Sequence, residues 1–273
     1  MIPLAFATRM PIKSNRGRKA YPTNLEGKLA VVTGGGSGIG LAITKALRAA
    51  GSDVVIVGRN AARLNAARGD DSRILTVAAD LANPDDRARL IEQLSGGRPL
   101  DILVNNAGSM TRIDLHNPDA QSLMDHDVAL DLEAPVHLCL ALLPVLRQRP
   151  EAAIVNVSTG LIYAPLAFNP GYSTAKAGLH GFTRSLRQQT RRDPIHVLEV
   201  FPPIVETELT KDFGGPKIGP EAVGAALVKA LRQDRTELRI GRAKLLYAMS
   251  RMVPNGIFSL INRAAGKRAG HVS

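Results

Sequence analysis

The chain has little of the material that several protein classes need. It contains one cysteine, no tryptophan and only 4% aromatic residues among its 273 positions. A single cysteine excludes an intramolecular disulfide, so we expect Cys139 to be a small buried side chain in a reducing compartment. The scarcity of aromatic rings removes the stacking platforms on which single-stranded nucleic acids bind.

Long hydrophobic runs are also missing. No segment has the ~20 consecutive apolar residues that a membrane-spanning helix needs. The opening stretch, MIPLAFATRM, has neither the basic leader nor the long apolar segment of a secretory signal. We therefore expect a cytoplasmic protein.

Acidic residues are absent from both ends of the chain. The formal charge is +11, but residues 1–25 hold five Lys/Arg and residues 238–273 hold seven, without any Asp or Glu. The body between them is close to neutral, which argues against a nucleic-acid-binding domain. We interpret the ends as solvated basic tails, and contact with an anionic surface is the alternative.

Short apolar runs rich in β-branched residues alternate with segments of helical spacing, such as Ile39, Ile43 and Leu47. This alternation predicts right-handed βαβ units. The expected fold is an α/β, three-layer, Rossmann-type doubly wound parallel sheet of about seven strands. The predicted strands span residues 29–33, 53–57, 73–77, 101–104, 153–157, 195–201 and 237–241.

One domain accounts for most of the chain. We expect a flexible basic extension over residues 1–26 and a single NAD(P)-binding domain over 27–273. The Pro- and Gly-rich stretch 202–220 follows the sixth strand and is the expected substrate loop. The apolar stretch 243–263 is split at Pro254 and predicts a pair of packing helices, with a pocket wall or a membrane-surface patch as the alternatives.

A glycine-rich loop, TGGGSGIG, follows the first strand. Gly34, Gly38 and Gly40 allow a tight turn into a helix and remove the Cβ atoms that would block a ligand. The helix that begins near Ser37 and Ile39 would offer free N–H groups to a pyrophosphate. We predict a dinucleotide site here. The alternative is a glycine-rich turn that has no binding role.

The end of the second strand indicates which dinucleotide binds. An acid here usually holds the ribose 2′-hydroxyl of NAD, but this chain has Gly58 followed by Arg59. An arginine fork suits a 2′-phosphate, so NADP(H) is favoured over NAD(H). The alternative is an unrelated surface arginine.

Two further motifs lie at strand ends on the predicted cofactor side. Asp80 and Leu81 follow the third strand, and the sequence NNAG follows the fourth. Asn106, Ala107 and Gly108 of that motif predict backbone packed closely against a ligand or a neighbouring strand.

The motifs TGGGSGIG, NNAG, VST and YSTAK, in this order and spacing, resemble the short-chain dehydrogenase/reductase family over roughly residues 27–210. The resemblance implies a nicotinamide cofactor, a tyrosine–lysine–serine site usually completed by an asparagine, and dimers or tetramers. VSTGLIYAP and PPIVETEL also resemble a reductase-like branch named for D-alanyl transfer to teichoic acid. We do not assign this chain to the pathway for which that branch is named.

Tyr172 and Lys176 match the family's catalytic tyrosine and lysine. Positions i and i+4 share a helix face, so the ammonium can lie near the phenol and reach the cofactor ribose. A nearby ammonium and an oxidised nicotinamide would lower the pKa of the phenol. Such a tyrosine can exchange a proton with a carbonyl or an alcohol.

Two positions depart from the family pattern. The family's serine falls on Thr159, which keeps the hydroxyl that holds the substrate oxygen, and the asparagine falls on Asp131. In the family the asparagine kinks its helix, and its main-chain carbonyl holds a water that relays protons to the lysine. The carboxylate of Asp131 could pair with Lys176 or accept protons itself.

The loop after the sixth strand completes the expected site. Pro202 and Thr207 match a cofactor motif of the family, with Pro203 in place of glycine. Leu161 and Tyr163 are expected to line an apolar substrate pocket. The six histidines show no metal-ligand spacing, so we predict no metal.

The sequence thus predicts an NADP-dependent oxidoreductase that interconverts a carbonyl and a secondary alcohol on a small molecule, as a homodimer or homotetramer. The rival hypothesis is a non-enzymatic NADP-binding sensor or scaffold with a weakened site. A weaker third hypothesis is membrane-surface contact through the C-terminal stretch.

Overall fold

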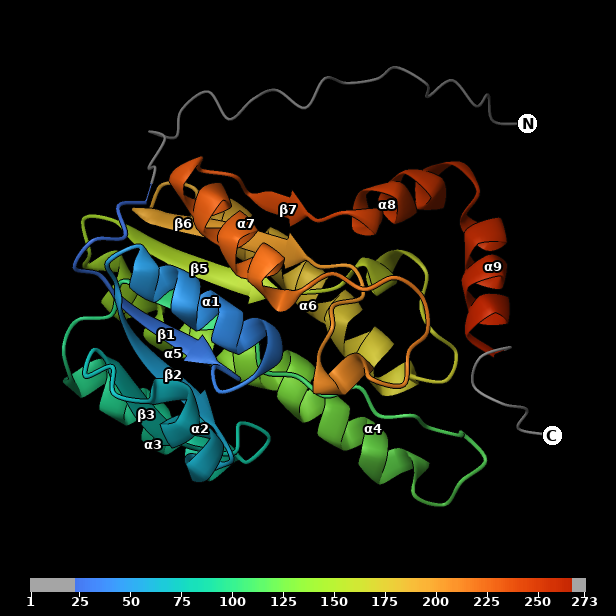
Figure 1. Ribbon diagram of the computed structural model, residues 1–273, viewed down its shortest axis with the longest axis horizontal. Coiled ribbons are helices and arrows are strands. Elements are labelled where there is room, and N and C mark those ends of the chain that lie inside the picture. The colour runs from blue at the N-terminus through green and yellow to red at the C-terminus, as the bar shows by residue number, and fades with distance from the viewer. Residues whose placement is uncertain (1–22, 267–273) are drawn as a thin grey trace.

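A parallel β-sheet forms the centre of the computed structural model, which describes residues 23–266 (Figure 1). Its strand order is β3-β2-β1-β4-β5-β6-β7. The seven strands are β1 (Leu29–Thr33), β2 (Asp53–Gly58), β3 (Ile74–Ala78), β4 (Ile102–Asn105), β5 (Ala152–Val157), β6 (Ile195–Phe201) and β7 (Glu237–Arg239).

The central strands are buried on both faces, as their continuous apolar sequences predicted. Every residue of β1, β4, β5 and β6 is buried, and Val31 pairs in register with Val55 on one side and Leu103 on the other. The predicted seven-strand parallel sheet is therefore confirmed. The last strand ends at Arg239 rather than residue 241, because the chain turns at Gly241 (φ 52°) into the next helix.

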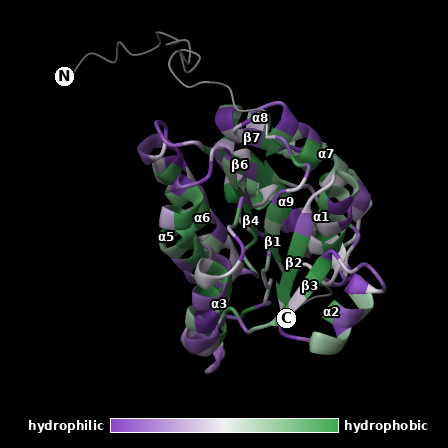
Figure 2. Cartoon of the chain, turned by 90° about the vertical axis from the view of Figure 1, so that its left-hand side faces the viewer, coloured by the Kyte–Doolittle hydropathy of each residue, from purple (hydrophilic) through white to green (hydrophobic). Residues whose placement is uncertain are grey.

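Helices cover both faces of the sheet and turn their apolar sides inward (Figure 2). One layer holds α1 (Gly38–Ala49), α2 (Ala61–Arg68) and α7 (Pro220–Arg232). The other holds α3 (Pro84–Gly96), α4 (Ala120–Val128), the π-helical turn η1 (Ala129–Glu133), α5 (Ala134–Arg147) and α6 (Pro170–Gln189). Short 3-10 turns are η2 (Gly160–Tyr163) and η3 (Glu208–Thr210).

Leucines fix the two helical layers to the sheet. Leu47 and Leu227 are fully buried on the α1–α7 side, and Leu138 and Leu142 on the α5 side. Each such side chain contributes about 1.5–3 kcal/mol relative to an exposed position. Aliphatic side chains therefore fill the core, which agrees with the absence of tryptophan from the sequence.

Helices α1 and α7 approach at backbone distance. A Cβ atom on Gly224 of α7 would lie 2.5 Å from the carbonyl oxygen of Ala42 in α1. Only glycine fits this contact, so α7 helps to fix the helix that carries the glycine loop.

The packed domain begins earlier than residue 27. Thr23 and Leu25 are buried, and Ser52 Oγ donates a 2.8 Å hydrogen bond to the carbonyl oxygen of Leu25. The boundary shifts because Leu25 belongs to the core of the α1–α7 side. The remainder of the predicted flexible extension, residues 1–22, lies outside the described residues.

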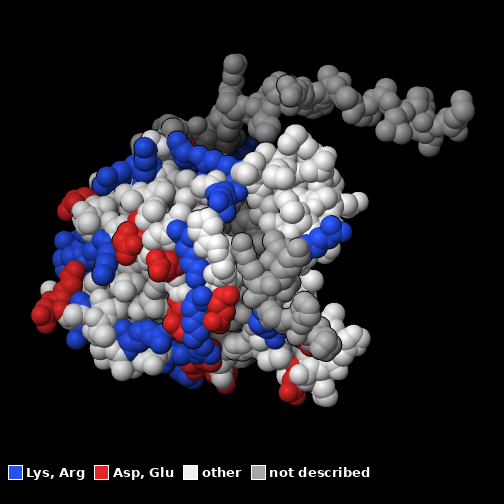
Figure 3. Space-filling model, turned by 45° about the vertical axis from the view of Figure 1, so that its right-hand side comes forward, with Lys and Arg blue, Asp and Glu red and all other residues white. Residues whose placement is uncertain are grey.

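The C-terminal stretch folds as the predicted pair of helices, α8 (Arg242–Met252) and α9 (Pro254–Gly266). Ala243 and Ile257 are buried, whereas five large apolar side chains are exposed, four in the two helices and one at the residue between them. Figure 3 shows this lobe as mainly uncharged surface with scattered basic groups. The five exposed side chains are Leu245, Met252, Val253, Phe258 and Leu260.

One helical stretch of the described chain, Ala120–Arg147, is long and apolar enough to cross a membrane by composition alone. Asp127 and Asp131 interrupt its apolar residues, which is why the sequence shows no unbroken apolar run of membrane-spanning length here. Both carboxyl groups are buried within the protein, and Cys139 on the same stretch is buried as predicted. Burial raises the pKa of the Cys139 thiol to about 12.

Candidate active site

The glycine loop lies at the carboxyl ends of β1 and β4, where the strand order reverses. Gly34 and Gly38 have φ angles of +65° and +49°, and a Cβ on Gly40 would lie 2.1 Å from the oxygen of Gly34. Ser37 makes no side-chain hydrogen bond to the helix that it precedes. The first turn of α1 therefore keeps N–H groups for a pyrophosphate, and these residues fit a dinucleotide.

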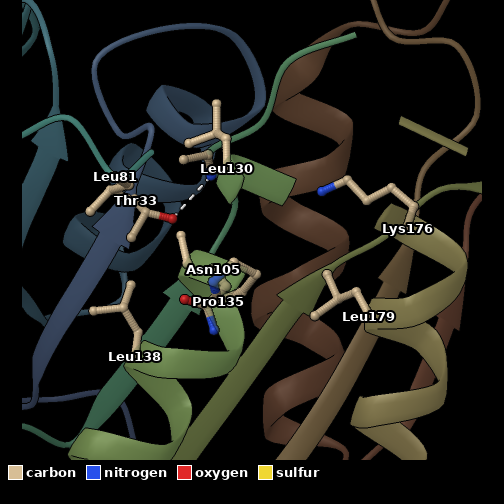
Figure 4. A pocket seen from close by; sticks show the side chains of 10 residues that line it. Thr33, Leu81, Asn105, Leu130, Pro135, Leu138, Lys176 and Leu179 are labelled. Carbon is tan, nitrogen blue, oxygen red and sulfur yellow. Dashed lines mark hydrogen bonds between the residues drawn. The ribbon is translucent and has the colours of Figure 1, made fainter. Parts of the chain in front are cut away.

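The NNAG motif holds this loop from the next strand. The backbone N–H groups of Asn106 and Ala107 donate to Thr33 Oγ1 at 2.8 and 3.0 Å, and the Asn106 amide donates to the Thr33 carbonyl oxygen at 3.0 Å. Figure 4 shows Thr33 beside this motif. The predicted close packing is against the end of β1, and it leaves Gly108 exposed on the open side.

The other predicted cofactor residues surround the loop. Arg59 is exposed at the end of β2, and no carboxylate within residues 23–266 pairs with it. Asp80 is half-buried and Leu81 is buried. Thr207 Cγ2 lies 3.0 Å from where a Cβ on Gly38 would stand, so the loop after β6 closes onto the glycine loop.

Tyr172 and Lys176 lie on α6 and are both buried. The ammonium nitrogen lies 5.8 Å from the phenol ring centre and donates a 3.2 Å hydrogen bond to the carbonyl oxygen of Val157. Thr159, on the turn after β5, lies close enough to the Tyr172 hydroxyl to lower its pKa. The structure therefore brings three of the four predicted catalytic side chains to one place.

Asp131 is the fourth. It is fully buried in the π-helical turn η1, and its Oδ1 lies 2.9 Å from the Lys176 ammonium nitrogen. Of the two roles left open by the sequence, pairing with the lysine is the one observed. The π-helical turn is the local distortion that the resemblance implied at this position.

The pKa values of these groups move with burial. The pKa of Tyr172 is raised, mainly by burial. The charge of Lys176 lowers this pKa, and the charge of Asp131 raises it. The expected lowering of this pKa is therefore wrong for the protein alone, because burial and the carboxylate outweigh the ammonium. Burial also raises the pKa of Asp131 against the pull of Lys176. The pKa of Lys176 is lowered by burial but raised overall by Asp131 and the phenol.

Sequence reasoning missed a polar cluster beside Asp131. Ser109 donates its backbone N–H to Asp131 Oδ2 at 2.9 Å, and its hydroxyl lies 2.7 Å from Asp127 Oδ1 and 3.1 Å from Asp131 Oδ2. The Thr111 hydroxyl donates to Asp127 Oδ1 at 2.8 Å. Asp127 and Asp131 have the same i, i+4 spacing that singled out Tyr172 and Lys176, and that signal could have found them.

The expected substrate-side residues form a wall with the C-terminal helices. Leu161 is half-buried in η2. Tyr163 packs its ring against Phe201 and Tyr247, with centroids 5.8 and 5.1 Å away, and its hydroxyl accepts a 3.0 Å hydrogen bond from Arg239 Nε. The hydroxyl of Tyr163 is thus already engaged, which leaves Leu161 and the ring to shape the pocket.

A narrow hollow lies beneath the catalytic lysine. Lys176 points from α6 toward the strand ends, where Asn105 and Leu130 lie (Figure 4). The residues that line the hollow are Thr33, Leu81, Asn105, Ala107, Leu130, Ala134, Pro135, Leu138, Lys176 and Leu179. Predicted cofactor residues and the predicted catalytic lysine therefore line one hollow.

Comparison with known proteins gives a family match over most of the chain. The family model described as short chain dehydrogenase matches residues 28–216. The chain is 41% identical to the uncharacterized oxidoreductase DltE of Bacillus subtilis (strain 168) over 183 residues, which cover 66% of this chain and 73% of that protein.

Two other relatives extend the comparison. A fatty acyl-CoA reductase of Acinetobacter baylyi is 29% identical over 88% of this chain and 86% of its own length. A crystal structure of a metagenomic short-chain oxidoreductase in complex with NADP superposes with a TM-score of 0.68 at 28% identity, covering 80% of this chain and 98% of that one. The non-enzymatic alternative finds no support among these proteins.

Proposed function

Since the chain belongs to the short chain dehydrogenase family of oxidoreductases, we propose that it uses NADP(H) to interconvert a carbonyl and a secondary alcohol. The observation that carries the proposal is the buried Tyr172–Lys176 pair, with Thr159 beside the phenol. This constellation lies at the same end of the sheet as the glycine loop, where the parallel strands have their carboxyl ends.

Each side chain has a distinct part in the proposed reaction. The bound nicotinamide supplies or accepts a hydride at the substrate carbon. Tyr172 donates a proton to the substrate oxygen or removes one from it, and Thr159 holds that oxygen by a hydrogen bond. Lys176 favours the phenolate by its charge, while Asp131 at 2.9 Å tempers that charge.

The preference for NADP(H) rests on Arg59. This side chain is exposed at the end of β2, next to Gly58, and the described carboxylates leave its guanidinium available. A guanidinium binds a phosphate through paired hydrogen bonds. The related metagenomic oxidoreductase that binds NADP supports the same assignment.

An apolar substrate fits the surroundings of the proposed site. Gly160, which opens η2, packs against Ala243 and Leu246 of α8. Leu161 and the ring of Tyr163 add to this apolar wall, and one relative is a fatty acyl-CoA reductase. We expect carbonyl compounds with aliphatic or aromatic groups to be better substrates than small polar ones.

Cofactor binding and turnover test this proposal together. We expect the wild-type protein to oxidise NADPH in the presence of at least one member of a carbonyl panel. Tyr172→Phe should lower kcat by about 10²–10⁴-fold while NADPH still binds, because only the acid–base group is removed. Tight NADPH binding without turnover on any substrate, unchanged by Asp131→Asn, would contradict it.

Assembly and location are further parts of the proposal. We expect a homodimer or homotetramer, and Leu140 of α5, 54% exposed, is a candidate contact. We expect the enzyme in the cytoplasm. Membrane contact stays the weaker alternative, supported by the exposed apolar side chains of α8 and α9. Salt-sensitive co-sedimentation with anionic vesicles would support that alternative, and its absence at low salt would remove it.

A further inference from the structure

Two buried carboxyl groups meet at one serine hydroxyl behind the catalytic lysine. Ser109 Oγ lies 2.7 Å from Asp127 Oδ1 and 3.1 Å from Asp131 Oδ2. Both aspartates have no exposed surface. A serine hydroxyl carries a single proton, so it can donate to only one of the two carboxyl groups at a time. A second proton, held on one of the two carboxyl groups, would make both contacts favourable.

The balance of charge around this unit points the same way. Lys176 and Tyr172 face Asp131 from α6, and Asp127 faces the shared hydroxyl from α4. The nearby cation Arg112, on the loop after β4, stacks its guanidinium over the ring of Phe168, 4.5 Å from the ring centre. The strand ends beneath contribute uncharged side chains. One ammonium thus stands against two buried carboxyl groups. Among the described residues Asp127 has no cation as partner and is held only by hydrogen bonds from Ser109 and Thr111, and a buried charge without a counter-charge is costly.

We propose that Asp127, Ser109 and Asp131 form a proton relay, in which the two carboxyl groups hold one proton between them and pass it through Lys176 to Tyr172. The role in turnover rests on the proposed function, whereas the shared proton does not. Asp131 stands 2.9 Å from the lysine nitrogen, which makes it the inner end of the relay.

The relay also has an outer end. The Thr111 hydroxyl is bonded to Asp127 Oδ1 at 2.8 Å, and Thr111 is only half-buried. Asn169, which precedes α6, holds the Thr111 carbonyl oxygen by a 2.7 Å hydrogen bond from its amide. Protons from solvent can therefore enter at Thr111 and move inward over hydroxyl and carboxyl groups.

The steps balance with one proton per turnover. During reduction Tyr172 gives its proton to the substrate oxygen. It would recover one from Lys176 through the ribose hydroxyl of the bound cofactor, which the lysine would hold between the two groups. The lysine amine takes a proton from Asp131, which takes one from Ser109, and the serine is resupplied across Asp127. The hydride comes from the cofactor, so no other reductant is needed. Oxidation runs the same transfers in reverse.

The shared proton can be tested without any substrate. We expect the infrared spectrum of the full chain at neutral pH to contain the carbonyl stretch of a protonated carboxylic acid. Asp127→Asn should abolish it, because Asp131 alone ionises beside Lys176. Asp131→Asn should shift or remove it, because the proton loses one of the two carboxyl groups that hold it. Asp125→Asn is the matched control, since Asp125 is exposed on the same helix. A spectrum without a band that responds to either variant would overturn the shared proton.

Kinetics test the relay itself. Ser109→Ala keeps the backbone N–H to Asp131 but removes the hydroxyl, and we expect kcat to fall at least tenfold with the NADPH Kd unchanged. Ser109→Thr should restore most of the loss. Burial raises the pKa of Asp131, so reductive kcat should fall as pH rises through that pKa. Asp127→Asn removes a neighbouring negative charge and should move this fall to lower pH.

The outcomes separate the two proposals. Wild-type kcat and an unchanged pH profile in Ser109→Ala would overturn the relay, even if the protein is an active reductase. A wild-type protein that turns over no substrate would refute the proposed function and the relay's role in it, and the infrared band would still decide whether the carboxyl groups share a proton.

Discussion

At the scale of single residues, Gly108 controls the position of the carboxylate beside the catalytic lysine. A Cβ atom on Gly108 would stand 2.5 Å from Asp131 Oδ1 and 3.6 Å from the lysine nitrogen. Gly108→Ala therefore has to displace Asp131. Since a misplacement of about 1 Å can cost a hundredfold in rate, we expect kcat to fall on that order.

Gly181→Ala is the control for this substitution. Gly181 lies on α6 with nothing within 4 Å of its added Cβ, so kcat should stay unchanged. Alanine in place of an exposed helical glycine should raise stability by about 1 kcal/mol. Steady-state kinetics and thermal melting of both variants decide the matter, and an unchanged kcat in Gly108→Ala would refute the expected displacement.

The sequence placed the predicted catalytic residues in space better than it placed their surroundings. Tyr172 and Lys176 could be predicted because helical spacing alone puts them on one face. The contact of Ser109 with Asp127 could not, because it depends on how the loop after β4 folds back over α4, 18 residues further along the chain. The pKa of Tyr172 was also misjudged, since sequence gives the nearest charges but not the burial.

At the scale of helices, we expect the contact between α1 and α7 to affect both stability and cofactor binding. Gly224→Val adds a side chain to α7. The Cβ atom of that side chain alone would lie 2.5 Å from the Ala42 carbonyl oxygen, which is too close for a van der Waals contact. Overpacking of this kind costs about 1–3 kcal/mol. Because α1 carries the glycine loop at its start, we also expect the Kd for NADPH to rise.

Ala225→Val is the matched control for this helix, since Ala225 is exposed on α7. It should cost well under 1 kcal/mol, the difference in helix propensity, and leave NADPH affinity unchanged. Denaturant unfolding and calorimetric titration measure both quantities. Equal affinity in the two variants would show that α7 does not position the loop.

Strands and helices could be predicted from period and composition, but some of their details could not. The buried strands read as continuous β-branched runs, and all seven were placed within two residues. The π-helical turn at Ala129–Glu133 has no distinct period in the sequence, although it fixes where Asp131 points. The approach of Thr207 to Gly38 joins two loops far apart in the chain and likewise leaves no local signal.

At the scale of the whole molecule, cofactor binding should stabilise the fold. A ligand at a hundred times its Kd adds about 2.7 kcal/mol, which for a chain of this size raises Tm by roughly 5–10 °C. We expect NADPH to produce this rise and NADH at the same concentration to produce a smaller one. Arg59→Asp should reduce the difference, because the guanidinium no longer meets the 2′-phosphate.

Thermal melting with each dinucleotide checks this expectation directly. Equal rises with NADPH and NADH in the wild-type protein would contradict the assigned preference. A difference that persists in Arg59→Asp would show that another group reads the 2′-phosphate.

The contact of α8 with η2 has a consequence for how this chain can be varied. The glycine loop, Arg59 and the proton-transferring side chains all precede residue 208, whereas the outer wall over η2 comes from the contiguous segment 242–266. If the proposed roles hold, the outer part of the substrate wall is encoded apart from the residues proposed to bind the cofactor. The turn at Gly241 is then a candidate crossover point, where recombination between relatives could exchange the outer wall and keep the cofactor site.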